Sequence, residues 1–202
     1  RSVIEGRAGV DRILGAWRTG DALGDRLLAF LENHDEQRLA SRFFAGDGRL
    51  GRPGMAVCVG LVRGPVMVYF AQELGEAADG ESGFSGDDGR TTIFDYWSVP
   101  SLRRCRNGGA WDGAGLSQAE RELREFYVRL LGLCSQEKAL TEGQVRLVPT
   151  GYERVLAWYR EHGGRKLFFA ANFDRESAHV ITADEGPVTV GPMDAIIPVL
   201  PS

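Results

Sequence analysis

Two short apolar runs, each ending in polar residues, constrain the fold of this chain more than any other feature. The first covers residues 27–31 and is followed closely by Asn33, His34 and Asp35. Such a run is typical of a strand buried in a parallel sheet, whose carboxyl edge carries ligand-handling side chains in α/β folds. In an extended strand, Asn33 and Asp35 project to one side and His34 to the other. The alternative is a turn or a helix N-cap, because Asn and Asp cap well and residues 36–39 are compatible with a helix start.

The second apolar run, at residues 64–75, follows the same pattern and contains Glu73 near its end. Between the runs, residues 53–62 are small and aliphatic and predict a helix. Together the three segments predict a strand, a helix and a second strand, the repeating unit of a parallel sheet. Two parallel strands that each end in a carboxylate, Asp35 and Glu73, indicate a site at that edge of the sheet.

These segments resemble glycoside hydrolase family 13, the α-amylase family. Residues 30–35 are similar to the family's strand-seven motif, which is an aromatic residue, two spacers and Asn-His-Asp, and residues 69–75 resemble its strand-eight motif. Residues 86–97 are similar to a loop after strand eight in some bacterial amylase-like proteins. The order and spacing of the three matches are more specific than any one of them. The strand-eight match has two departures, because residues 64–65 lack the usual spacer between Gly and Pro, and Ala71 stands where glycine is common.

The resemblance implies a role for each polar residue near the strand ends. Retaining glycosidases use one carboxylate as nucleophile and another as acid/base around an oxocarbenium-like transition state. Asp35 matches neither of these and resembles the family's third carboxylate, a transition-state stabiliser that contacts sugar hydroxyls. His34 would donate to sugar hydroxyls and Asn33 would hold the strand end or the sugar. Arg38 would bind near the substrate by pairing with Asp35 or a loop acid, and Glu73 would line the site or be a structural acid.

The resemblance also implies that part of the enzyme is missing from this chain. In the family, the nucleophilic Asp and the acid/base Glu lie upstream of the strand-seven motif, and the short segment before Asp35 contains no Gly-x-Arg-x-Asp sequence. A (β/α)8 barrel needs roughly 250 residues, more than the 202 present, and the chain begins with Arg1. We therefore expect an inactive C-terminal fragment of a retaining hydrolase or transglycosylase of α-linked glucans. The alternative is a non-catalytic amylase-like module that binds carbohydrate or a protein partner.

The predicted fold is α/β followed by all-β. Residues 1–142 would supply the last two βα units of the barrel, with helices at residues 10–18 and after Ser117, where Ser117 and Glu120 form a capping box. Residues 143–202 would form a small antiparallel β-sandwich, with a hairpin turn at residues 162–164. The predicted strands of this β-domain are residues 145–148, 155–160, 166–171, 178–182, 188–190 and 195–200.

An irregular loop at residues 76–115 allows three interpretations. It is rich in Gly, Asp and Ser, and a loop of this length is usually functional or disordered. It is a solvated loop, a calcium site or a wall of a sugar-binding groove. Calcium favours clustered oxygen ligands, and aromatic rings of a groove wall can stack on sugar faces. The candidate calcium ligands are Asp79, Glu81, Asp87 and Asp88, and the candidate groove aromatics are Phe84, Tyr96, Trp97 and Trp111. No cofactor or metal site is otherwise expected.

The composition of the chain limits the classes of partner that it is expected to bind. A formal charge of −4 with 43% hydrophobic residues fits a soluble globular protein and gives no support for nucleic-acid or membrane-surface binding. No apolar run reaches bilayer length and no signal peptide is visible, while the compartment is not indicated. Three widely spaced cysteines predict free thiols. The expected partner is an oligo- or polysaccharide, and the open edges of a partial barrel predict self-association or a rearranged packing.

Overall fold

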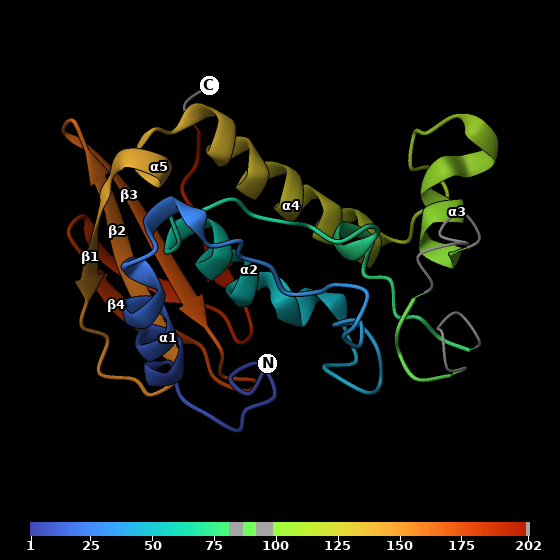
Figure 1. Cartoon of the computed structure of the whole chain (residues 1–202), viewed down its shortest axis with the longest axis horizontal. Coiled ribbons are helices and arrows are strands. Elements are labelled where there is room, and N and C mark those ends of the chain that lie inside the picture. The colour runs from blue at the N-terminus through green and yellow to red at the C-terminus, as the bar shows by residue number, and fades with distance from the viewer. Residues whose placement is uncertain (81–86, 92–98, 201–202) are drawn as a thin grey trace. The chain divides into compact units, whose positions relative to one another are not determined.

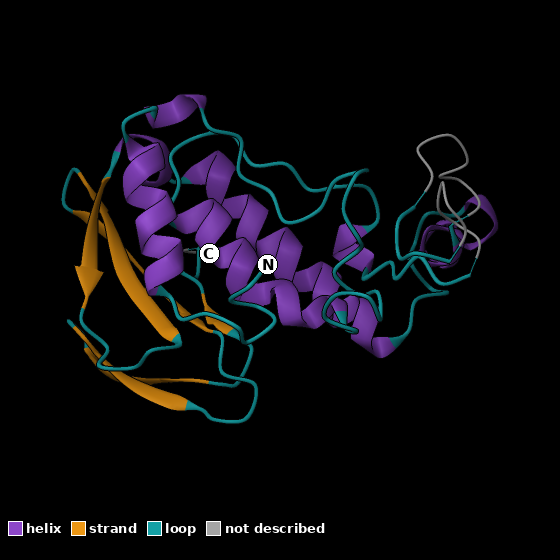
Figure 2. Ribbon diagram, turned by 60° about the horizontal axis from the view of Figure 1, so that its bottom comes forward, coloured by secondary structure: helices purple, strands orange, loops and turns teal. Residues whose placement is uncertain are grey.

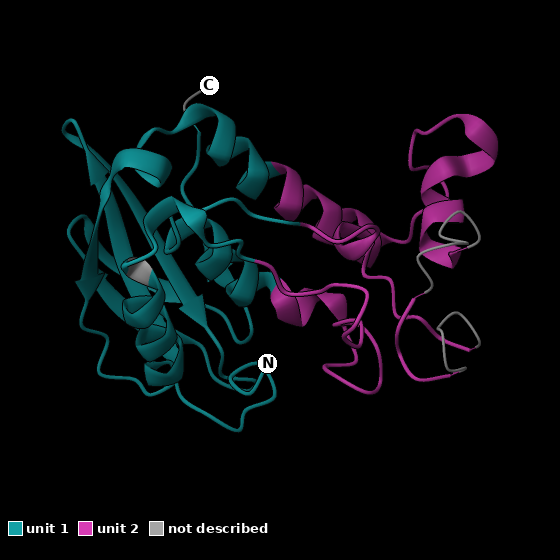
Figure 3. Cartoon of the chain, viewed as in Figure 1, with its two compact units in different colours: residues 1–29, 52–67, 129–202 teal, residues 30–51, 68–128 magenta. Residues whose placement is uncertain are grey.

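The computed structural model describes residues 1–80, 87–91 and 99–200 (Figure 1). The chain divides into two compact units (Figure 3). Unit 1 comprises residues 1–29, 52–67 and 129–202, and unit 2 comprises residues 30–51 and 68–128. Each unit is therefore assembled from separated stretches of chain. The division of a parent enzyme into a barrel part at 1–142 and a β-domain at 143–202 stays a prediction.

The structure contains the helices that the sequence predicted. The helices predicted at residues 10–18 and 53–62 are confirmed as α1 (Asp11–Asp21) and α2 (Arg52–Gly60), and the capping box opens α4 (Gln118–Gln136) as expected. The amide of Ser117 donates to Glu120 Oε2 at 2.7 Å, and the amide of Glu120 donates to Ser117 Oγ at 3.3 Å. The described helices are α1 (Asp11–Asp21), α2 (Arg52–Gly60), α3 (Pro100–Arg106), α4 (Gln118–Gln136) and α5 (Ala139–Glu142), with short 3-10 turns at Gly24–Arg26, Gly48–Gly51, Gln72–Leu74 and Asn107–Gly109.

All of the named strands follow residue 143 and pair antiparallel, as predicted. They form a four-stranded sheet in the order β1-β2-β3-β6 and a separate pair, β4-β5. Figure 2 shows the strands in orange. The hairpin between β2 and β3 turns at Gly163 and Gly164, whose φ angles are +55° and +82°. Both central residues of this tight turn need positive φ, which glycine adopts without strain. The strands are β1 (Gln144–Val148), β2 (Val155–His162), β3 (Arg165–Asn172), β4 (His179–Ala183), β5 (Gly186–Val190) and β6 (Ala195–Ile196).

The central strands β2 and β3 are buried on both faces, which explains why β2 is nearly continuous in apolar residues. On one face, Val155 and Ala157 pack in a cluster with Ile181 and Val190 of the β4-β5 pair. On the other face, the indole of Trp158 donates to the carbonyl of Gly60 in α2 at 2.9 Å. Unit 1 is thus layered, with the β4-β5 pair on one side of the four-stranded sheet and α2 on the other.

The two apolar runs that were predicted as barrel strands pair only briefly. Ala29 and Val66 form one parallel bridge. It is held by a bond from the Ala29 amide to the Pro65 carbonyl and one from the Met67 amide to the Ala29 carbonyl, both 2.9 Å. The parallel direction is as expected, but the strands are much shorter. A strand built for burial on both sides needs neighbours along both edges, and each run has one among the described residues. The two complete βα units stay a prediction.

The three cysteines are free thiols, as predicted. Cys58 is buried in α2, and burial raises the pKa of its thiol to about 12, so it is inert near neutral pH. None of the helices in the described parts of the chain combines the length and the apolar character that a membrane span requires.

Candidate functional site

In the Asn-His-Asp turn, residues 33–35, one side chain caps the turn and a different one is exposed to solvent. Asn33 Oδ1 accepts the amides of Asp35 at 2.9 Å and Glu36 at 3.0 Å, so the capping role belongs to Asn33. The carboxylate of Asp35 is left available, with 76% of the side chain exposed. Its Oδ1 lies 3.5 Å from Nε2 of His34, which is also exposed. The turn therefore presents an imidazole and a carboxylate side by side to solvent.

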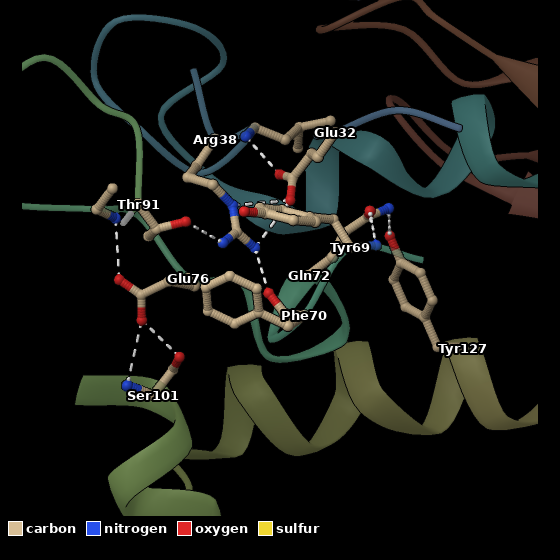
Figure 4. A network of polar contacts seen from close by, with 11 residues as sticks. Glu32, Arg38, Tyr69, Phe70, Gln72, Glu76, Thr91, Ser101 and Tyr127 are labelled. Atoms are coloured by element: carbon tan, nitrogen blue, oxygen red, sulfur yellow. Dashed lines mark hydrogen bonds and ion pairs between the residues drawn. The ribbon is translucent and has the colours of Figure 1, made fainter. Parts of the chain in front are cut away.

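A buried ion pair spans the base of this turn (Figure 4). Arg38 and Glu32 are 0% and 2% exposed, and Nε of Arg38 donates to Glu32 Oε2 at 2.9 Å. The other Glu32 oxygen, Oε1, accepts the amide of Leu39 at 2.5 Å. Burial raises the pKa of Glu32, while the Arg38 charge and the Leu39 amide oppose that increase. The carboxylate is thus held in the unit interior by several donors at once.

Arg38 also contacts two segments far away in sequence. Its Nη1 donates to the hydroxyl of Thr91 at 3.0 Å and its Nη2 to the carbonyl of Phe70 at 2.8 Å. The predicted pairing of Arg38 with Asp35 is wrong, because the carboxylate it binds is that of Glu32. Because Arg38 is fully buried, it can act on a ligand at the surface only through the residues that it holds.

The end of the second run is shaped by a left-handed residue. Ala71 has φ +57° and precedes the 3-10 turn Gln72–Leu74, which explains why a glycine is favoured at this position of the motif. Gln72 is buried and fixes the segment from both sides. Its Oε1 accepts the Tyr69 amide at 3.1 Å and its Nε2 donates to the Tyr127 hydroxyl at 2.8 Å. Glu73 is half-buried in this turn, and no ion pair joins it to Asp35 among the described residues.

The charge of Asp35 contributes to the pKa shifts of two residues, Tyr69 and Arg90, that were not predicted as site residues. Desolvation raises the pKa of the Tyr69 hydroxyl, with Thr91 and Arg38 lowering it and the charges of Glu32 and Asp35 raising it further. The pKa of Arg90 is raised by its hydrogen bond to Asp88 first, and by the charge of Asp35 among others. Arg90 lies within residues 86–97, the third match to the family, and that match was the sequence signal that could have identified it.

The predicted loop site is only partly described. Asp87 pairs with Arg42, and Asp88 pairs with Arg90 at 2.6 Å. Within residues 1–80, 87–91 and 99–200, no cluster of three His, Cys, Asp or Glu side chains is arranged to hold a metal. Trp111 is 62% exposed. The other candidates, Glu81, Phe84, Tyr96 and Trp97, lie outside the described residues.

A pocket lies within unit 1. Its volume is about 410 Å³. Its lining is mostly aliphatic, including Val59, Val66 and Leu131, with Arg63 and Cys134 among the few polar groups. None of the residues assigned to the sugar site lines it, so it does not compete with the Asn-His-Asp turn as the candidate site.

Solved structures with the same fold are enzymes of the α-amylase family. The cyclic α-maltosyl-(1→6)-maltose hydrolase from Arthrobacter globiformis matches 97% of this chain at TM-score 0.68 and 17% identity. The maltogenic α-amylase AmyB from Thermotoga neapolitana matches 99% at TM-score 0.59 and 17% identity. AmyP E221Q, solved with maltotriose, matches 94% at TM-score 0.59 and 14% identity.

These likenesses show that the chain shares its fold with part of each of these enzymes, while the two complete βα units and the β-sandwich stay predictions. The chain spans 42%, 48% and 44% of the three neighbours, so it corresponds to less than half of each enzyme. No protein-family model matches the sequence, and no curated protein matches it.

Proposed function

We propose that this chain is the C-terminal part of an α-amylase-like glycoside hydrolase that acts on α-linked glucans by a retaining mechanism. The observation that carries the proposal is the likeness in fold over 97% of the chain to an enzyme of which it spans 42%. The motifs at residues 30–35 and 69–75 support it independently of the fold. The partner is accordingly an α-glucan oligo- or polysaccharide.

Asp35 is the residue proposed to contact the reacting sugar. Its carboxylate is solvent-exposed and does not cap the turn, because Asn33 does so. A fixed anion aimed at an oxocarbenium-like ring stabilises the charge that develops there. His34 donates to neighbouring hydroxyls, and Asn33 holds both in place. Glu73 lines the site from the adjacent segment.

The chain alone supplies this stabilising carboxylate but no assigned nucleophile or acid/base. Both must come from a preceding segment of the same polypeptide, so the chain by itself should not hydrolyse glycosides. Arg38 is buried and is assigned no direct contact with the sugar.

The experiment uses the polypeptide encoded by the whole gene. Asp35→Asn should lower kcat on maltotriose on the order of 10²- to 10³-fold, the typical effect of removing one preorganised electrostatic group. Glu36→Gln, which removes the next carboxylate in the same turn, should leave kcat within about twofold of the unmodified enzyme. A near-normal rate for Asp35→Asn, or a gene with no upstream Asp and Glu, would contradict the proposal. The second outcome favours a non-catalytic carbohydrate- or protein-binding module.

A further inference from the structure

The Glu32–Arg38 pair brackets the Asn-His-Asp turn in sequence. Glu32 directly precedes Asn33, and Arg38 follows Asp35 by three residues. Their contact at 2.9 Å, together with the bond from the Leu39 amide to Glu32 Oε1 at 2.5 Å, closes the loop at its base. Both ends of the turn are therefore tied to one buried carboxylate.

The guanidinium then fixes this closed loop to the rest of unit 2. Three of its nitrogens donate to three different residues, Glu32, Thr91 and the carbonyl of Phe70. The backbone amide of Arg38 adds a bond of 2.6 Å to the carbonyl of Gly89. Its carbon Cζ also lies 5.0 Å from the ring centroid of Tyr69. Three stretches of chain, residues 30–39, 69–72 and 87–91, meet at this one side chain.

Burial of such a pair is hard to explain by stability alone. Apolar residues of similar volume commonly stabilise a core as well as a buried ion pair does. A planar fork with five donors differs from them in fixing the direction of each partner. The contacts of Arg38 use that property, because its acceptors are a carboxylate, a hydroxyl and a carbonyl in different segments.

We propose that Arg38, anchored by Glu32, is a positioning residue that sets the location of the Asn-His-Asp turn against residues 69–72 and 87–91. The consequence for sugar binding rests on the proposed function, whereas the positioning itself does not. The loop that carries Asp35 is fixed at its base by the contacts of Glu32 with Arg38 and Leu39. Arg38 acts through that loop and touches no sugar.

The test compares backbone amide signals of ¹⁵N-labelled variants of this chain. Glu32→Gln combined with Arg38→Met removes both charges, so no unpaired ion is left in the core. Arg38→Lys keeps the cation but cannot reach three separate acceptors. Arg42→Met is the matched control, because it removes an exposed ion pair with Asp87 in the same loop.

The proposal predicts that the double variant shifts or broadens the amide signals of Asp35 and Glu36 while the signals of α4 stay in place. Arg38→Lys should give an intermediate shift, and Arg42→Met should leave the turn unchanged. Unchanged Asp35 and Glu36 signals in the double variant would overturn the proposal, since only residues touching Arg38 would then have moved. Loss of the α4 signals in Arg38→Lys as well as in the double variant would also overturn it, because the pair would then hold the whole unit.

Adding maltotriose separates this inference from the proposed function. The unmodified chain should show sugar-dependent shifts at residues 33–35, and the double variant should show them at least tenfold more weakly at equal sugar concentration. If the unmodified chain shows none, the proposed function fails while the sugar-free comparison still decides the positioning. If both proteins respond equally, the positioning has no consequence for the site and the proposal is overturned in that part.

Discussion

Because Glu32 and Arg38 form a buried ion pair, removing one of the two charges should lower the stability of unit 2. Arg38→Met leaves the Glu32 carboxylate without its cation in a site where the side chain is 2% exposed. Breaking a buried pair in this way costs about 3–5 kcal/mol of unfolding free energy. In a Glu32→Gln background the same change removes hydrogen bonds to Thr91 and Phe70, but it also removes a buried cation that has lost its carboxylate partner. At roughly 1 kcal/mol for each bond, the second cost is at most about 2 kcal/mol.

The pH dependence of Arg38→Met follows from the direction of the Glu32 pKa. Burial raises that pKa in the folded state, so the neutral acid is the form that folding favours. Stability is then highest below the unfolded pKa and falls as pH rises toward the folded pKa. The positive charge of Arg38 lowers the pKa of Glu32, so removing Arg38 raises that pKa further. The loss of stability with rising pH then becomes larger. The variant should therefore lose more stability at pH 7 than at pH 5.

The assay is urea unfolding of the unmodified chain, both single variants and the double variant, at pH 7 and pH 5. Because the chain has two compact units, hydrogen exchange of peptides from residues 30–51 and 68–80 should follow unit 2 separately. The double-mutant cycle of unfolding free energies should show a coupling energy between Glu32 and Arg38 of about 1–3 kcal/mol at pH 7. Additive costs, or an Arg38→Met penalty equal at both pH values, would contradict an energetic coupling between the two buried charges.

Three further predictions test local features. Ala71→Gly relieves a residue with φ +57°, which offsets the lost buried methyl, so it should cost at least about 1 kcal/mol less than Ala56→Gly inside α2; equal losses in urea unfolding would contradict this. Ser117→Ala should lower stability by about 1 kcal/mol through loss of the cap, whereas Ser135→Ala near the other end of α4 should change it little; equal thermal shifts would count against the cap. Amide hydrogen bonds and His179 lower the pKa of Asp174 to about 2, so its stabilising effect is complete above the unfolded pKa and is lost as pH falls toward 2; thermal melts of Asp174→Asn should lack that component, and an unchanged acid profile would refute it.

The parts of the fold that were predictable are those fixed by local chemistry. The capping box at Ser117 needs only Glu120 three residues later, and the glycine pair at 163–164 fixes a hairpin by its backbone freedom. The β-strands were found because their pattern and turn signals lie within short windows. These features do not depend on distant partners.

The site was less predictable because its contacts cross long sequence separations. Arg38 reaches Thr91 across 53 positions and Phe70 across 32, and no local pattern encodes either contact. The resemblance identified the Asn-His-Asp turn, whereas the predicted partners of Arg38 were Asp35 or a loop acid and the carboxylate it binds is the buried Glu32. The apolar runs predicted long strands because their composition reflects burial on both sides, whereas the described chain pairs each of them at one bridge only.

Titration of the ¹⁵N-labelled chain with maltotriose, followed at the amides of His34, Asp35 and Tyr69, tests the proposed sugar site most directly. Saturable shifts are expected at these residues, and Asp35→Asn should weaken them at least tenfold while Glu36→Gln does not. Absence of shifts at residues 33–35, or equal binding by Asp35→Asn and the unmodified chain, would contradict the assignment of the Asp35 carboxylate to a sugar site.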